Sequence, residues 1–370
     1  MNFLRALFHG PPFLHLNACG LDISDNSYKY IKLEEHPKGG YRIGDYGSVP
    51  IPSEIVGAGI IKNEDALSDL LKQTFHKKPY TYAAFSLPEE QGFVRRIQLP
   101  RMPEKDVAGA IRLQLDEHVP LQPEDVTFAH HVIPSETKKD TLDVLIVAYP
   151  KIIVESYKTT VQRAGLTPLA AEIESEAIAR AVVPQNELAN PTLIVDIGLT
   201  RTSLLIARHG FAHFTSTIAI GGNHFHEAIA RTLNISVREA EKMKKRYGLS
   251  ESDETKKLFT ALLPLVQAIQ NEIILRINFW QSENIRTNQA GDMAIKKVYL
   301  CGGDANLTHL VRYIEKNIDL PVEHANVWTN VVRVPSYVPE IEFNTSLGYT
   351  TSIGLALGTM KQSHLPNQTA

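Results

Sequence analysis

Cysteine, long apolar runs and an excess of either charge are all scarce in this sequence, and each scarcity excludes a class of protein. The 370 residues contain two cysteines, Cys19 and Cys301, which cannot build the disulfide framework of a small secreted domain. Lys and Arg number 38 against 41 Asp and Glu, a net charge of −3 that argues against a protein that coats nucleic acid. We see no stretch of the roughly 20 apolar residues that cross a bilayer. Hydrophobic residues at 43% and charged residues at 21% instead indicate a globular protein of two or more domains.

The N-terminal tail, residues 1–16, is apolar at helical spacing. Phe3, Leu4, Leu7 and Phe8 precede Gly10-Pro11-Pro12, without the long apolar region and cleavage site of a secretory signal. We therefore expect a cytoplasmic protein. The segment is either a short foot on a membrane surface or a tail tucked onto the body. We favour the tail, because one or two helical turns bind lipid poorly.

One pattern of elements occurs twice along the chain. β-rich runs at 16–23, 28–33 and 41–49 precede a helix with Asn63 as its N-cap and a further strand at 80–87. From Thr192 the pattern returns, and the repetition predicts a duplicated domain. The elements expected there are strands at 192–198, 202–208, 211–218 and 297–300 and helices at 236–247, 254–263, 264–281, 308–317 and 352–360.

Between the two copies, residues 91–165 read as a self-contained α/β unit. Its strands are expected at 93–99, 126–133 and 142–148, and its last helix at 152–164.

Two polar turns follow the buried strands that open the two copies. Asp22 precedes Ser24-Asp25-Asn26-Ser27, and Asp196 precedes Gly198 and a run ending at Thr202. A carboxylate at a strand end, followed by turn N–H groups, is suited to a metal–phosphate group. Each turn alone is more typical of ordinary turn chemistry, but their matched contexts strengthen the functional interpretation.

Two further signals are weaker. Gly302-Gly303 ends a strand and lets a flat ring approach the backbone, although a tight strand-to-helix turn explains it equally well. Glu241 and Lys244 lie three apart on one helix face, a spacing more typical of a solvated surface pair.

Taken together, these segments resemble the motifs of actin-like ATPases. Residues 20–29 resemble the first phosphate loop, 196–202 the second, 300–307 the adenosine motif, 240–244 the ribose- and base-contacting helix, and 352–357 the closing connector. Within that superfamily, residues 214–222 and the unit 91–165 resemble the PilM branch, a type IV pilus assembly family related to FtsA.

The resemblance implies an α/β, two-lobed actin-like ATPase fold made of duplicated RNase H-like domains with an inserted 1C-type subdomain. The implied divisions are the first lobe (1A) at 17–90 and 166–191, the 1C-like insert at 91–165, the second lobe (2A/2B) at 192–345, and a closing helix with a polar tail at 346–370.

The resemblance also implies an ATP pocket between the lobes. Asp22 and Asp196 would organise Mg²⁺, and Glu174 would position the attacking water unless it is only an exposed acid at a helix start. Lys29 lies where the family has a lysine, although strand alternation would also allow it to point away. The residues expected to face phosphates, ribose and base are Asn26, Ser27, Lys29, Gly198, Thr200, Thr202, Glu241, Lys244, Gly302 and Gly303.

Several positions depart from the family pattern. Asp25 would place a carboxylate beside a triphosphate unless Mg²⁺ or Arg201 offsets it, and Ser24 has a Cβ where close backbone approach is wanted. Asp304 replaces a small residue beside the paired glycines. His224 and His226 would not share a helix face, so we interpret them as surface or lobe-contact residues. We therefore expect nucleotide binding with slow turnover.

The implied function is a cytoplasmic, ATP-binding scaffold of type IV pilus assembly, peripheral to the inner membrane through its partners. It would hold the N-terminal cytoplasmic peptide of a PilN-type inner-membrane protein between subdomains 1A and 1C. It would also contact the pilus motor ATPase, form a homo-oligomer or ring, and bind no nucleic acid.

Two alternatives remain open. A small-molecule kinase on the same fold lacks a convincing substrate-facing carboxylate here. An FtsA-like filament protein would need an amphipathic C-terminal anchor, which the polar residues 361–370 do not resemble.

Overall fold

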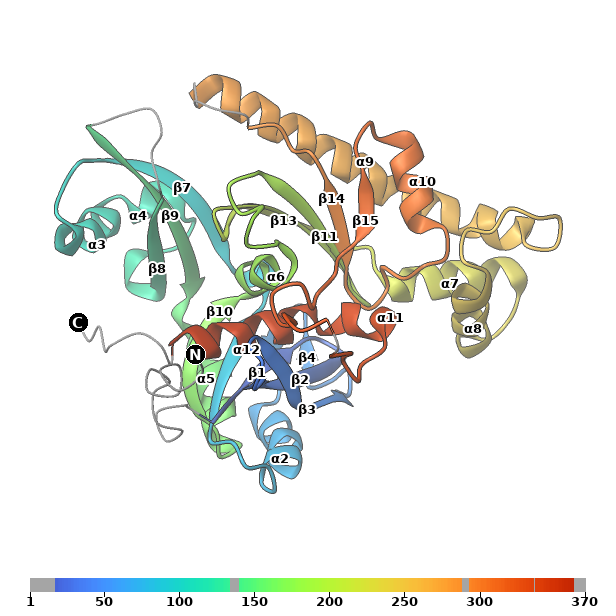
Figure 1. Cartoon of the computed structure of the whole chain (residues 1–370), viewed down its shortest axis with the longest axis horizontal. Coiled ribbons are helices and arrows are strands. Elements are labelled where there is room, and N and C mark those ends of the chain that lie inside the picture. The colour runs from blue at the N-terminus through green and yellow to red at the C-terminus, as the bar shows by residue number, and fades with distance from the viewer. Residues whose placement is uncertain (1–16, 134–139, 288–292, 336, 363–370) are drawn as a thin grey trace.

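The computed structural model describes residues 17–133, 140–287, 293–335 and 337–362. Figure 1 shows two large sheets in the body of the molecule, with helix α12 (Thr350–Gln362) between them, and a third sheet beside the second. The N-terminal tail 1–16 and residues 363–370 of the polar tail lie outside the described residues, so the predictions for them stay predictions.

The first sheet combines three antiparallel strands with two parallel ones, in the order β3-β2-β1-β6-β10. Helix α2 (Glu64–Phe75) begins where the sequence predicts, because the Asn63 side chain accepts a hydrogen bond from the Ala66 N–H at 3.0 Å. The strands are β1 (Ala18–Ile23), β2 (Ser27–Glu35), β3 (Tyr41–Pro50), β6 (Tyr82–Leu87) and β10 (Thr167–Ile173), with a small hairpin of β4 (Val56–Gly57) and β5 (Ile60–Ile61) beside them.

The second sheet repeats this arrangement strand for strand. Its order is β13-β12-β11-β14-β15, again three antiparallel strands followed by two parallel ones. The duplicated fold predicted from the sequence is therefore confirmed. The strands are β11 (Thr192–Ile197), β12 (Thr202–Arg208), β13 (Phe211–Ile218), β14 (Val298–Cys301) and β15 (Val322–His324), and the shorter helices of this lobe are α7 (Gly222–Leu233), α8 (Val237–Tyr247), α10 (Leu310–Asn317) and α11 (Phe343–Ser346).

The two helices expected at 254–263 and 264–281 are one helix, α9 (Lys256–Thr287), which passes through Pro264. Leu262, Val266 and Ile269 lie on both sides of the proline and are fully buried in one core. Burying three such side chains stabilises by about 1.5–3 kcal/mol each, which outweighs the roughly 3 kcal/mol that an interior proline costs. The break predicted at Pro264 is therefore wrong.

Helix α9 is also long and apolar enough to cross a membrane, by length and composition alone, over Lys256–Asn284. It is the one helix among the described residues that passes this test, and it contradicts the expectation of no such run. Its buried residues, which make up 28% of its most apolar stretch, belong to the core of the second lobe.

The inserted unit is a three-stranded sheet in the order β7-β9-β8, covered by two short helices with a core of their own. Helix α5 (Lys151–Arg163), which the sequence grouped with this unit, instead buries Ile153, Tyr157 and Val161 in the core of the first lobe. The insert therefore packs as a separate body only to about Pro150. Its elements are β7 (Phe93–Pro100), α3 (Glu104–Leu113), α4 (Leu115–His118), β8 (Val126–Ile133) and β9 (Thr141–Pro150).

Two helices pack against each other at the junction of the two lobes. The closing helix α12 (Thr350–Gln362) packs on α6 (Glu174–Val182) and on β1. A Cβ atom on Gly354 would collide with the backbone of Ala177, so only glycine allows the two helices to approach this closely. This contact sets the distance between the β1–β2 and β11–β12 turns.

Candidate functional site

A cavity of about 290 Å³ lies between the two lobes. It is bounded by the β1–β2 and β11–β12 turns, the first residue of α6, one face of α8, the turn after β14 and the start of α12. The expected site residues that line it are Asp22, Asn26, Ser27, Lys29, Glu174, Asp196, Gly198, Thr200, Glu241, Lys244, Gly302 and Gly303. Thr202 does not.

The carboxylate of Asp22 stands at the end of β1. The Ser86 hydroxyl donates to its Oδ1 at 2.9 Å, and Lys29 is its register partner on β2. Burial raises the pKa of Asp22, while Lys29 and Ser86 oppose that rise. Lys29 lines the cavity and its Nζ lies 3.4 Å from the Ser27 hydroxyl, so it does not point away.

Asp25 does not stand where the sequence placed it. It is not among the residues that line the cavity, and its Oδ1 accepts the Gly59 N–H at 2.9 Å. Its Oδ2 lies 3.7 Å from the Arg201 guanidinium, which also pairs with Glu90 at the root of the insert. The expected like charge is therefore directed away from the cavity and paired, and its Oδ2 also accepts the Thr200 hydroxyl at 3.4 Å.

Asp196, at the end of β11, is less well compensated than Asp22. Burial and the charge of Asp22 raise its pKa to about 6, and the Cys301 thiol donates weakly to its Oδ1 at 3.8 Å. A bound cation would relieve this buried negative charge. Among the described residues no group of three acidic, His or Cys side chains is arranged to ligate a metal directly. Two carboxylates alone suit a cation such as Mg²⁺, which usually keeps several of its water molecules and takes one or two carboxylates as ligands.

Thr202 is the expected phosphate residue that the structure places elsewhere. It is fully buried, and its hydroxyl donates to the Ile220 carbonyl at 2.7 Å. Because successive side chains of a strand point to opposite faces, its neighbour Ser203 lines the cavity instead. Both faces of β12 are buried, so alternation in the sequence alone does not show which of the two hydroxyls faces the cavity.

Glu174 is buried, not an exposed acid. It is the first residue of α6 and is 8% exposed. Burial, followed by the charges of Asp22, Glu89 and Asp196, raises its pKa well above the usual range. These surroundings disfavour the ionised form of the side chain, which is the form that accepts a proton.

The far end of the cavity contains a buried ion pair. Lys244 pairs with Asp304, while Glu241 pairs with Lys245 at 2.7 Å, so Glu241 and Lys244 do not form the surface pair suggested by their spacing. Both cations and both acids line the cavity. The sequence contains all four residues, but the pair of Lys244 with Asp304 joins segments 60 residues apart.

The two histidines of α7 differ from each other. The Nδ1 atom of His224 accepts the Gly221 N–H at 3.2 Å and so caps the helix. His226 is buried and lines the cavity, and its Nε2 has no hydrogen-bond partner in the described part of the chain. The interpretation of His226 as a surface residue is therefore wrong.

Comparison with solved structures shows the same fold. The PilM-PilN type IV pilus biogenesis complex matches with a TM-score of 0.76 and 23% identity, covering 93% of this chain and 99% of the other. MreB5 of Spiroplasma citri bound to ADP matches with a TM-score of 0.55 and 16% identity, covering 95% and 98%. These matches, together with the two repeated sheets, establish an actin-like ATPase fold.

Sequence comparison finds shorter matches among cell division proteins and a nearly complete match to one family. FtsA of Neisseria meningitidis serogroup B is 21% identical over 195 residues, which are 48% of this chain and 47% of that protein. FtsA of Streptococcus pneumoniae is 27% identical over 104 residues, 28% of this chain and 23% of that protein. The chain thus spans about half or less of these relatives. Residues 20–360 match the family "Type IV pilus assembly protein PilM", and the chain belongs to that family.

Proposed function

We propose that this protein is a cytoplasmic scaffold of type IV pilus assembly that binds ATP and Mg²⁺ between its lobes and a PilN-type partner at its insert. Contact with the pilus motor ATPase, a homo-oligomeric ring and a position at the inner membrane through its partners are parts of the same proposal. The observation that carries it is the convergence of residues from distant segments, including Asp22, Asp196 and Lys244, on one interlobe cavity.

The cavity supports nucleotide binding with slow turnover. Asp22 and Asp196 would hold Mg²⁺, which supplies charge for the phosphates, and Lys29 lies on the same side. Glu174 is the residue in position to orient a water, but burial and the neighbouring carboxylates raise its pKa and disfavour the ionised form that would accept a proton from it. Binding without rapid hydrolysis is suited to a scaffold whose conformation a ligand controls.

Calorimetry with ATP and Mg²⁺ on nucleotide-free protein tests this half of the proposal. Wild type is expected to bind, and Asp196→Ala is expected to abolish the heat. Asp116→Ala, which removes an exposed acid of the insert, is the matched control and should bind as wild type does. No heat and no thermal shift with wild type at millimolar ATP would remove the nucleotide claim.

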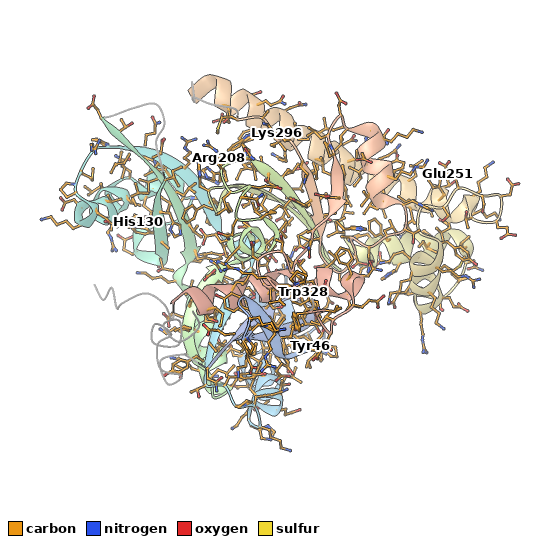
Figure 2. The ribbon with its side chains drawn as sticks, viewed as in Figure 1. Tyr46, His130, Arg208, Glu251, Lys296 and Trp328 are labelled. Carbon is orange, nitrogen blue, oxygen red and sulfur yellow. The ribbon has the colours of Figure 1, made fainter. Side chains whose placement is uncertain are left out.

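The seam between the insert and the first lobe supports peptide binding. The outer strand β8, which carries the labelled His130 in Figure 2, is joined to α6 by an ion pair of His131 with Glu176 at 3.3 Å. Val132 on β8 is 42% exposed and Ile152 at the start of α5 is 77% exposed. An extended peptide can pair with a strand edge and pack its side chains on such residues.

Fluorescence polarisation with the N-terminal cytoplasmic peptide of the cognate PilN-type protein tests this half. Val132→Asp and Ile152→Asp are each expected to weaken binding about tenfold, which is about 1.4 kcal/mol. Leu113→Asp, on α3 of the same insert and 85% exposed, is the matched control. Binding no better than that of a scrambled peptide would refute the groove. If the variants change only the sedimentation coefficient, the seam is a contact between subunits of a ring.

A further inference from the structure

A second cavity lies at the opposite edge of the insert. It measures about 480 Å³ and is enclosed by β7 of the insert, β13 of the second lobe and the C-terminal part of α9. Figure 1 shows these three elements side by side above the first lobe, and β7 and β13 are in contact. The cavity lies along β7, while the β8 edge also reaches β13, where the rings of His131 and Phe211 lie 4.4 Å apart.

The cavity follows strand edges, not strand faces. Val94, Arg95 and Arg96 are consecutive in β7, and His213 and Phe214 are consecutive in β13, yet all five line it. Because successive side chains of a strand point to opposite faces, consecutive residues share one cavity only along the edge. Both strands are the outermost of their sheets. Such an edge presents backbone groups that an extended peptide can pair with.

The wall formed by α9 and β13 is aromatic. The rings of Phe214 and Phe279 lie 4.9 Å apart, and Phe279 is 38% exposed although it is fully apolar. The Trp280 indole beside them is fixed, because its N–H donates to the Met293 carbonyl at 2.8 Å. A rigid, partly exposed aromatic surface is suited to an apolar side chain of a ligand.

His213 adds a defined polar group. Its Nε2 lies 3.1 Å from the Arg208 carbonyl, which can only accept, so Nε2 carries the hydrogen. Nδ1 then has a lone pair and, in the described part of the chain, no partner. The side chain is 9% exposed, and burial lowers its pKa to about 3, so the ring stays neutral. A ligand N–H or O–H would donate a hydrogen bond to this Nδ1 atom.

Arg95, Arg96 and Glu283 are the charged residues that line the cavity, and Arg96 is paired with Asp143 at 3.0 Å, which leaves Arg95 as the cation considered for a ligand. It is exposed, and its guanidinium donates to the Val94 carbonyl at 2.9 Å, an acceptor on its own strand. A carboxylate is a stronger partner for guanidinium than a neutral carbonyl. An acidic ligand would therefore draw Arg95 away and leave the Val94 carbonyl to accept a peptide N–H.

We propose that the groove between β7, β13 and α9 binds a second extended peptide, with an apolar side chain on Phe214 and Phe279 and a neighbouring carboxylate on Arg95. The proposal deepens the proposed function, because a scaffold would then hold two partners at the two edges of one insert. The occupant is a partner peptide because the cavity combines strand edges, an aromatic wall and a cation.

The test uses fluorescein-labelled Thr-Val-Phe-Glu-Val-Thr and its two variants with Gln or Lys in place of Glu, titrated into the full chain to millimolar concentration. Wild type should bind the Glu peptide at least fivefold more tightly than the Gln peptide, and the Lys peptide most weakly. Arg95→Glu, a surface change, should reverse the order of the Glu and Lys peptides. Phe279→Asp should weaken binding of all three. Equal binding of the three peptides, no binding, or an unchanged order in Arg95→Glu would overturn the proposal.

Its failure is distinguishable from failure of the proposed function. Val132→Asp should leave the Glu peptide unaffected, and Arg95→Glu should leave the PilN-type peptide unaffected. If the two peptides compete, there is one groove and this inference falls while the proposed function stands. If Arg95→Glu instead dissolves a dimer seen by sedimentation velocity, the occupant is a second copy of the chain and the proposal is overturned. Thermal melts of each variant check that it is folded.

Discussion

The β1–β2 and β11–β12 turns occupy the same place in two copies of one sheet, yet different contacts hold them. The first turn carries Ser24, whose hydroxyl donates to the Ser27 carbonyl at 2.8 Å, and Asp25, which holds the Gly59 N–H. The second turn packs against the start of α7, where the Gly222 N–H donates to the Gly198 carbonyl at 3.0 Å. Polar side chains hold the first turn, while close backbone packing adds to the second, whose Thr200 and Arg201 side chains also reach Asp25 of the first turn.

This difference extends to the two strand-end acids. Asp22 receives a hydroxyl hydrogen bond from Ser86 and pairs in register with Lys29, whereas Asp196 receives a weak hydrogen bond from the Cys301 thiol. Asp196 also contacts Gly302, because a Cβ there would collide with its carboxylate and with Ile197. The comparison teaches that the second turn depends on small residues and the first on hydrogen-bonding groups.

Gly302→Ala is expected to have the largest effect, because it disrupts the close packing of the turn after β14 against Asp196 and Ile197. Gly302 has φ +93°, where an alanine is strained, and its Cβ would meet Asp196. We expect a loss of about 3 kcal/mol in the free energy of unfolding, measured by urea denaturation. The adjacent Gly303→Ala is the control, because no atom lies within 4 Å of its Cβ position. Equal stability of the two variants would contradict the packing argument.

Asp25→Ser is expected to have an intermediate effect on the first turn. It removes the acceptor of the Gly59 N–H and one partner of Arg201, so we expect a loss of about 1–2 kcal/mol. Asp25→Asn keeps an acceptor and should lose less. The like-charge argument from the sequence predicts tighter ATP binding in Asp25→Ser. The orientation of Asp25 away from the cavity instead predicts unchanged or weaker ATP binding in Asp25→Ser. Calorimetry of ATP binding distinguishes the two outcomes.

Ser24→Gly is expected to have the smallest effect, because it makes the first turn resemble the second. It removes the hydroxyl bond to the Ser27 carbonyl and adds backbone freedom, for a loss of about 1 kcal/mol in thermal or urea unfolding. Ser24→Thr keeps the hydroxyl and should remain close to wild type. A gain in stability with glycine would show that the first turn also prefers close backbone packing.

Much of the fold was predictable because its signals are local. Asn63 caps α2 as expected, and the two triple-stranded patterns marked the duplication. The break expected at Pro264 and the assignment of α5 to the insert were wrong, since local punctuation cannot show which core a helix joins. Thr202 and Ser203 lie on a strand that is buried on both faces, so only the packing showed which of them lines the cavity.

The sequence by itself determined that two acids follow two equivalent strands, because hydrophobic periodicity and turn residues are properties of short segments. It also contained the motifs of the family that residues 20–360 match. Only the tertiary structure decided how charges pair, as in Arg201 with Asp25 and Lys244 with Asp304. Such pairs join distant segments, and their geometry depends on how the lobes pack. The same packing turned one acid of the first turn into the cavity and the other out of it.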